Sequence, residues 1–205
     1  MTGAALRAFH GDAAVKAKYL NRVRAHRAAD ELIQGTGWSG TRGCAVGCTL
    51  EAYDHSRYPI ELGIPVELAH LEDFVFESLP KVDALAWPER FLDAASPGAD
   101  LRLVWDRFTH WILTEEHPDR AEHCARMGAL FARRIAAEEP SKDEWDLAAG
   151  DARAAGATGA TWAAWAALAA WDARDALAAW DARDARDASA KRMADKLIAL
   201  MAATQ

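Results

Sequence analysis

Apolar residues recur every three or four positions along most of the chain, which is the period of an amphipathic α-helix. The stretch from Asp100 to about Glu116 shows this spacing most clearly. No segment alternates convincingly between apolar and polar residues, as a half-buried strand does, and no Asn-Gly turn is present. We therefore expect an all-α fold, an irregular helical domain of about six or seven helices. Before the C-terminal region, the expected helices cover residues 12–33, 65–79, a short stretch from 88, 100–116, a stretch that follows Pro118 and continues up to Pro140, and 141 to about 150 or 156.

Local signals mark where several of these helices begin. Asp12 is a residue type that favours the N-cap position. Pro65 and Pro88 are suited to a first helical turn, where no backbone N–H is needed. Ser141 followed by Glu144 is a capping-box signature.

The last 46 residues, after Gly159, contain neither glycine nor proline and are rich in alanine. Alanine has the highest helix propensity, so we expect one helix of about 65–70 Å, unless it breaks at an unmarked point. We divide the chain into a helical body, 1–156, and a long C-terminal helix, 157–205. A nine-residue repeat turns Trp171 and Trp180 to opposite sides. This pattern suggests a homo-oligomer or capture of a partner helix, and the alternative is sequence drift in a tolerant region.

The charge is unevenly distributed. The net charge is −7, yet residues 1–50 carry seven Lys or Arg against three acidic residues. That stretch is therefore basic on an otherwise acidic protein. A compact basic patch fits a small anionic ligand better than long nucleic acid, because the acidic remainder repels a phosphate backbone. The alternative is a solvated basic face that pairs with the acidic part of the chain.

The chain begins without the apolar segment of a signal peptide, and no apolar run is long enough to span a bilayer. Three cysteines form an odd set, and two of them lie only four residues apart, which suits a reducing compartment. We expect a soluble, cytoplasmic protein with no membrane contact.

The glycine-rich segment 34–48 is the strongest candidate for a binding loop. Its GxGxxG pattern follows a helix rather than a strand, which argues against a dinucleotide fold. Five glycines nevertheless allow backbone N–H groups to converge on an anion, and a tryptophan can stack on a base. We expect a small anionic ligand, such as a nucleotide, with no cofactor identified. The candidate ligand-binding residues are Gly37, Trp38, Gly40, Arg42, Gly43, Arg24 and Arg27.

The cysteines within and beside this segment have three interpretations. In the first, Cys44 or Cys48 is a nucleophile with His55 as its base, and these three are the candidate catalytic residues. In the second, the same three residues bind zinc, but the Cys-x3-Cys spacing is uncommon for such sites and we predict no metal. In the third, both cysteines are buried and inert. Cys124, on an apolar helix face, is expected in the core.

DNA is not expected as a partner. Residues 61–68 faintly suggest the corner of a helix-turn-helix motif. The helix that would enter the major groove carries four acidic residues, which repel phosphates. They are Glu67, Glu72, Asp73 and Glu77.

Residues from about Tyr19 to Phe91 contain four distinctive phrases, which are GCAVGCT at 43–49, HSRY at 55–58, ELGIP at 61–65 and PERFLD at 88–93. In these phrases the chain resembles an uncharacterised group of proteins from bacterial and phage genomes. The resemblance implies an accessory protein and carries no assigned activity. It directs attention to residues 35–65.

Three hypotheses follow from the sequence. The first is an accessory protein that binds a small anion at the glycine-rich loop and self-associates through its C-terminal helix. The second is an enzyme centred on Cys44 or Cys48 with His55. The third is a structural or partner-binding helical protein without chemistry of its own.

Overall fold

The computed structural model describes residues 6–116, 121–154 and 180–204. Helices account for the regular structure, and the described residues contain isolated β-bridges, Leu32 with Gly43 and Trp38 with Gly43, but no strand. The all-α prediction is confirmed. Within these described ranges, no helix has both the length and the apolar character needed to cross a membrane.

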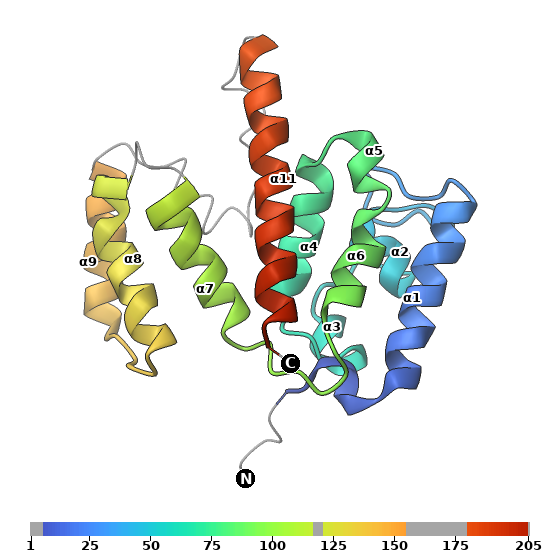
Figure 1. The fold of residues 1–205 in the computed structure, drawn as a ribbon, viewed down its shortest axis with the longest axis horizontal. Helices are drawn as coiled ribbons and strands as arrows, with labels where there is room; N and C mark the ends of the chain where they lie inside the picture. Colours follow the sequence, from blue (N-terminus) through green and yellow to red (C-terminus); the bar gives the residue numbers. More distant parts are fainter. Residues whose placement is uncertain (1–5, 117–120, 155–179, 205) are drawn as a thin grey trace. The chain divides into compact units, whose positions relative to one another are not determined.

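The chain forms two compact units, 1–102 with 180–205 and 103–179. In the first unit, α4 packs against α2, α6 and α11, and α1 packs against α2 and α6 (Figure 1). The largest fully buried side chains include Trp87, Phe76 and Phe91. The helices of this unit are η1 (Ala8–Gly11), α1 (Ala13–Ala28), α2 (Ala45–Leu50), α3 (Arg57–Glu61), α4 (Val66–Ser78), α5 (Lys81–Ala84), α6 (Trp87–Ala94) and α11 (Trp180–Ala202).

Helix α1 begins as predicted and ends five residues early. The Asp12 carboxylate accepts a hydrogen bond from the backbone N–H of Ala14, so Asp12 is the N-cap. Asp30 adopts a left-handed conformation with φ 56°, and the N–H of Glu31 donates to the carbonyl of His26. After this tight turn, Leu32 lies outside the helix and forms a β-bridge with Gly43. The predicted helix end at Ile33 is therefore wrong. The short helices α2, α3 and α5 fall below the length that periodicity detects.

The second unit contains α7 (Val104–Trp111), a π-helical turn η2 (Ile112–Glu116), α8 (Ala121–Ile135) and α9 (Lys142–Ala154). Cys124 lies in its core, as predicted, together with Leu113, Met127 and Phe131. The capping box is confirmed, because the N–H of Ser141 donates to the Glu144 carboxylate and the N–H of Glu144 donates to the Ser141 hydroxyl.

The predicted division at residue 156 differs from these two units. Helix α11 packs on α4 and α6, and buries Ala194, Leu197 and Met201. Two ion pairs reinforce this packing, Arg90 with Asp195 and Lys191 with Asp83. From Ala190 to Met201, the C-terminal helix is thus part of the first core. The first part of the predicted continuous helix, residues 160–179, and with it the opposed Trp171, lies outside the described residues.

Candidate functional site

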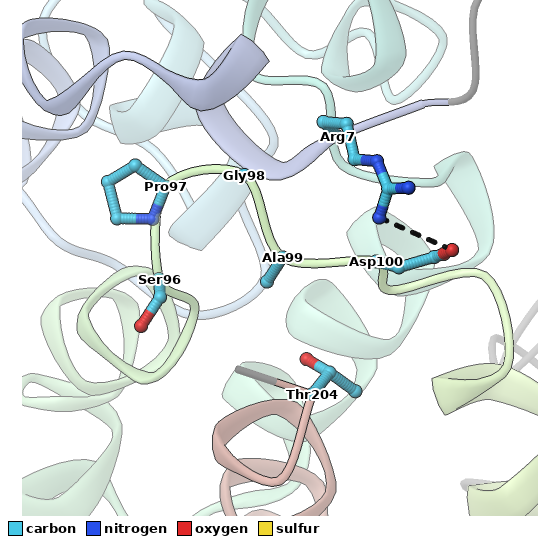
Figure 2. Close-up of a pocket in the computed structure, with 7 residues that line it drawn as sticks. All are labelled: Arg7, Ser96, Pro97, Gly98, Ala99, Asp100 and Thr204. Atoms are coloured by element: carbon cyan, nitrogen blue, oxygen red, sulfur yellow. Dashed lines mark ion pairs between the residues drawn. The ribbon is translucent and has the colours of Figure 1, made fainter.

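A surface depression of the first unit holds few reactive groups (Figure 2). Arg7 and Arg102 both pair with Asp100, at 3.5 Å and 2.6 Å. The hydrogen bond from Arg102 is the largest contribution that lowers the pKa of Asp100, to about 2. The lining of the depression therefore carries one cation and one anion, Arg7 and Asp100, which pair with each other. The lining contains no imidazole or thiol. The lining residues are Arg7, Ser96, Pro97, Gly98, Ala99, Asp100 and Thr204.

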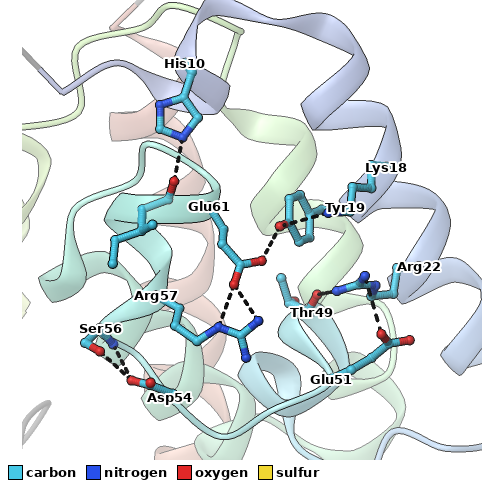
Figure 3. Close-up of polar contacts among 11 residues, drawn as sticks. His10, Lys18, Tyr19, Arg22, Thr49, Glu51, Asp54, Ser56, Arg57 and Glu61 are labelled. Carbon is cyan, nitrogen blue, oxygen red and sulfur yellow. Dashed lines mark hydrogen bonds and ion pairs between the residues drawn. The ribbon is translucent and has the colours of Figure 1, made fainter.

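The basic residues of the N-terminal stretch are largely engaged by acidic partners. Arg22 donates to the carbonyl of Thr49 and pairs with Glu51 (Figure 3). Arg24 and Arg27, both predicted ligand-binding residues, pair with Glu89 of α6 at 2.7 Å and 3.4 Å. This pattern favours the interpretation in which the basic face pairs with acidic parts of the chain.

A second polar group in Figure 3 ties α1 to α3. The Tyr19 hydroxyl donates to Glu61 at 2.5 Å, and Arg57 pairs with the same carboxylate. Burial, followed by the bond to Glu61, raises the pKa of Tyr19 to about 12. This group holds the helices together and exposes no reactive atom.

The glycine-rich loop closes on itself. The N–H of Gly43 donates to the carbonyl of Glu31, the N–H of Cys44 to that of Thr36, and the N–H of Arg42 to the Ser39 hydroxyl. These donors are therefore not available to converge on an anion. A Cβ on Gly43 would lie 2.3 Å from the carbonyl oxygen of Gly37, and one on Gly47 would lie 1.9 Å from it. The glycines at 43 and 47 thus permit close packing of the loop.

The other predicted loop residues do not form a common site. Trp38 is half-buried and packs edge-on against His26, with ring centroids 5.5 Å apart. Gly40 has a positive φ of 98° at an exposed turn, beside the exposed Arg42. No described side-chain contact joins Trp38 to Arg42, so the two residues do not outline a shared ligand site. The geometry does not favour the anion-binding hypothesis.

A different group of side chains converges between α2 and α4. The Cys44 thiol, an oxygen of Asp73 and an oxygen of Glu77 all lie within 4.8 Å of one another. Asp73 and Glu77 are four residues apart on α4 and so share a helix face. Cys44 is the N-cap of α2, where its sulfur accepts the N–H of Gly47. We call Cys44, Asp73 and Glu77 the thiol–carboxylate cluster.

Two further side chains hold Asp73. The Tyr53 hydroxyl donates to Asp73 Oδ2 at 2.9 Å, and His55 Nε2 lies 3.3 Å from the same oxygen. The other oxygen, Asp73 Oδ1, is buried and has no hydrogen-bond partner among the described residues. The Tyr53 ring packs directly on Gly37, and His55 stacks on His70 with centroids 4.1 Å apart. Asp73 is therefore oriented from one side and bare on the other.

The Cys44 thiol is not activated. Burial is the largest cause, and the neighbouring Asp73 charge the next, of a pKa for Cys44 well above its ordinary range. The described hydrogen bond of the His55 imidazole runs to Asp73 rather than to the Cys44 thiol. In the structure, Cys44 and His55 both lie beside the Asp73 carboxylate. This arrangement does not favour the predicted nucleophilic catalysis.

Cys48 lies outside the cluster. Its side chain is fully buried, and its thiol donates to the carbonyl of Gly43 at 3.4 Å. Burial raises the pKa of Cys48 to about 12. These observations match the interpretation of an inert core cysteine for Cys48 alone.

A buried acid lies next to the cluster in the sequence. Glu72 is fully buried and accepts a hydrogen bond from the Tyr58 hydroxyl, while its Oε1 has no partner among the described residues. Burial raises the pKa of Glu72 well above its ordinary value. Burial therefore favours the neutral, protonated form of Glu72.

Sequence reasoning missed Tyr53, Asp73 and Glu77 as site residues. The four-residue spacing of Asp73 and Glu77 on a predicted helix indicates two carboxylates on one helix face. In the sequence analysis these acidic residues were interpreted only as evidence against DNA binding. Comparison of the chain with protein-family models, with curated proteins and with solved structures finds no match, so the resemblance of residues 19–91 to an uncharacterised group stays a prediction.

Proposed function

We propose that the protein binds a divalent transition-metal ion of the zinc type through Cys44, Asp73 and Glu77. The observation that carries the proposal is the approach of one sulfur and two carboxylate oxygens to within 4.8 Å of one another. Zinc binds sulfur at about 2.3 Å and carboxylate oxygen at about 2.0–2.2 Å, so its ligand atoms lie about 3.5 Å apart. Small rotations of the three side chains bring the cluster to that geometry.

The hydrogen bonds around the cluster suit a metal site. Asp73 is fixed through Oδ2 by Tyr53 and His55, while the buried Oδ1 has no hydrogen-bond partner among the described residues. Glu77 accepts the N–H of Gly35 at 2.7 Å. Ligating carboxylates in proteins are commonly held in this way by a second set of donors. The orphaned oxygen of Asp73 would then have a partner.

The kinds of ligand atom select among metals. A thiolate is a soft ligand that favours zinc and related transition metals, whereas magnesium and calcium prefer oxygen alone. The metal also removes the cost of ionising Cys44 beside two carboxylates, because a divalent cation stabilises the thiolate. This proposal replaces the expectation of no metal and keeps Cys44 as the central residue.

Cobalt substitution of the full chain tests the proposal. Co²⁺ added to chelator-treated protein is expected to give a near-ultraviolet thiolate-to-cobalt charge-transfer band, which zinc then abolishes by displacement. Cys44→Ser should lose the band, and Asp73→Asn should weaken cobalt binding. Cys48→Ser, four residues away and equally buried, is the matched control and should keep the band.

Circular dichroism of each variant separates loss of the site from loss of the fold. A wild-type protein that folds but gives no charge-transfer band contradicts the proposal. A band that survives in Cys44→Ser and disappears in Cys48→Ser contradicts the assignment of the ligand.

A further inference from the structure

The thiol–carboxylate cluster supplies three ligands and leaves a tetrahedral ion one position short. Among the described residues, three potential metal-ligand atoms, from Cys44, Asp73 and Glu77, lie within 4.8 Å of one another. Structural zinc sites are closed by four protein ligands, whereas sites with three protein ligands keep a position for water or substrate. The number of ligands therefore indicates an open site.

His55 is the obvious fourth ligand, and two contacts hold it in another role. Its Nε2 lies 3.3 Å from Asp73 Oδ2, and its ring stacks nearly parallel on His70, at 12° between planes. An imidazole bound to a ligating carboxylate orients that carboxylate rather than the metal. Moving His55 into the coordination sphere would break both contacts.

The cluster borders the surface on the side of Tyr53. Cys44 is buried, and the side chain of Asp73 is only 13% exposed, but Tyr53 is 44% exposed. The Tyr53 ring covers Gly37, and its hydroxyl reaches Asp73. One carboxylate of the cluster is thus hydrogen-bonded to a residue that solvent reaches.

The charge of the site determines which ligand it accepts. One thiolate and two carboxylates around a divalent ion leave about one net negative charge. Arg24 and Arg27 of α1 do not offset it, since both pair with Glu89. A negative centre in a partly buried site repels an incoming anion.

We propose that the bound metal keeps one coordination position free of protein ligands, and that this position takes a neutral nitrogen or oxygen donor in preference to an anion. The inference rests on the proposed metal site. It replaces the small anion expected from the sequence with a neutral ligand class.

The visible d–d bands of the cobalt protein test this inference, because they respond to a change in the ligands of the metal. Imidazole, a neutral donor, and azide, an anionic one, are titrated separately into the full chain. We expect imidazole to shift the bands at concentrations at least about ten-fold lower than azide. His55→Ala should respond to imidazole as the wild type does.

The alternative outcomes are distinct. Azide binding as tightly as imidazole overturns the charge argument. A wild type insensitive to both, with His55→Ala sensitive to imidazole, identifies His55 as the fourth ligand and overturns the open position. In each of these cases the thiolate-to-cobalt band is present, whereas its absence contradicts the metal site itself.

Discussion

Replacing Glu72 by Gln should remove a pH-dependent destabilisation of the first unit. Glu72 is fully buried, and its one described partner is the Tyr58 hydroxyl. Burial disfavours the charged carboxylate and raises its pKa well above the ordinary value. Gln has nearly the same shape and stays neutral at every pH. The substitution therefore isolates the cost of keeping a proton on a buried acid.

The sign and size follow from proton linkage. The folded state keeps the Glu72 proton, while the unfolded state loses it above a pKa of 4.5. Stability is therefore fully present below pH 4.5 and falls as the pH rises toward the folded-state pKa, by about 1.4 kcal/mol per pH unit. Between pH 5.5 and 7.0, we expect the wild type to lose stability relative to Glu72→Gln, by up to about 2 kcal/mol.

Each protein is equilibrated in urea at pH 5.5 or 7.0 and then labelled with a short pulse of thiol reagent at one common pH. The urea dependence of labelling measures this difference in stability. Cys48 and Cys124 are buried in the first and second units, so the two labelled peptides report each unit separately. The chelator-treated protein is used so that metal binding does not contribute. A difference between wild type and Glu72→Gln that stays constant from pH 5.5 to 7.0, as read at Cys48, would refute the reasoning. The Cys124 peptide should show no difference at either pH.

Two further predictions concern the loop and the cluster. Gly47→Ala places a Cβ 1.9 Å from the carbonyl oxygen of Gly37 and should destabilise the first unit by about 3 kcal/mol in the same labelling assay. Gly150→Ala, whose Cβ meets nothing within 4 Å, should be neutral or stabilising by up to about 1 kcal/mol, and equal effects at the two sites would contradict the close packing. Tyr53→Phe should weaken cobalt binding about ten-fold while keeping the thiolate band, because only the orienting bond to Asp73 is lost; unchanged affinity would show that the hydroxyl does not position that carboxylate.

Local signals in the sequence predicted the helices and their starts well. Asp12 and Ser141 act as the caps that their residue types indicate, because capping depends on atoms only two or three residues away. The end of α1 was mislocated because Asp30 adopts a left-handed conformation that no glycine announces. Such a turn depends on the bridge between Leu32 and Gly43, which joins residues eleven apart.

The candidate site was harder to predict because its members are distant in the sequence. Cys44 and Asp73 lie on different helices, and only the packing of α2 on α4 brings them together. Glu72 falls four residues after Leu68 on the buried face of α4, so the apolar period places it in the core although its residue type argues for the surface. Polar residues at core positions of a periodic pattern are therefore the signal to look for in such chains.

The first unit is discontinuous in the sequence, and this has a consequence for synthesis. Its core includes Leu197 and Met201 of α11, which are separated from α6 by the whole of the second unit. A ribosome makes α11 after the second unit, so the second unit is able to fold while the first still exposes the apolar surfaces of α4 and α6. During translation, therefore, the first unit, which carries the thiol–carboxylate cluster, is the later of the two to complete its core.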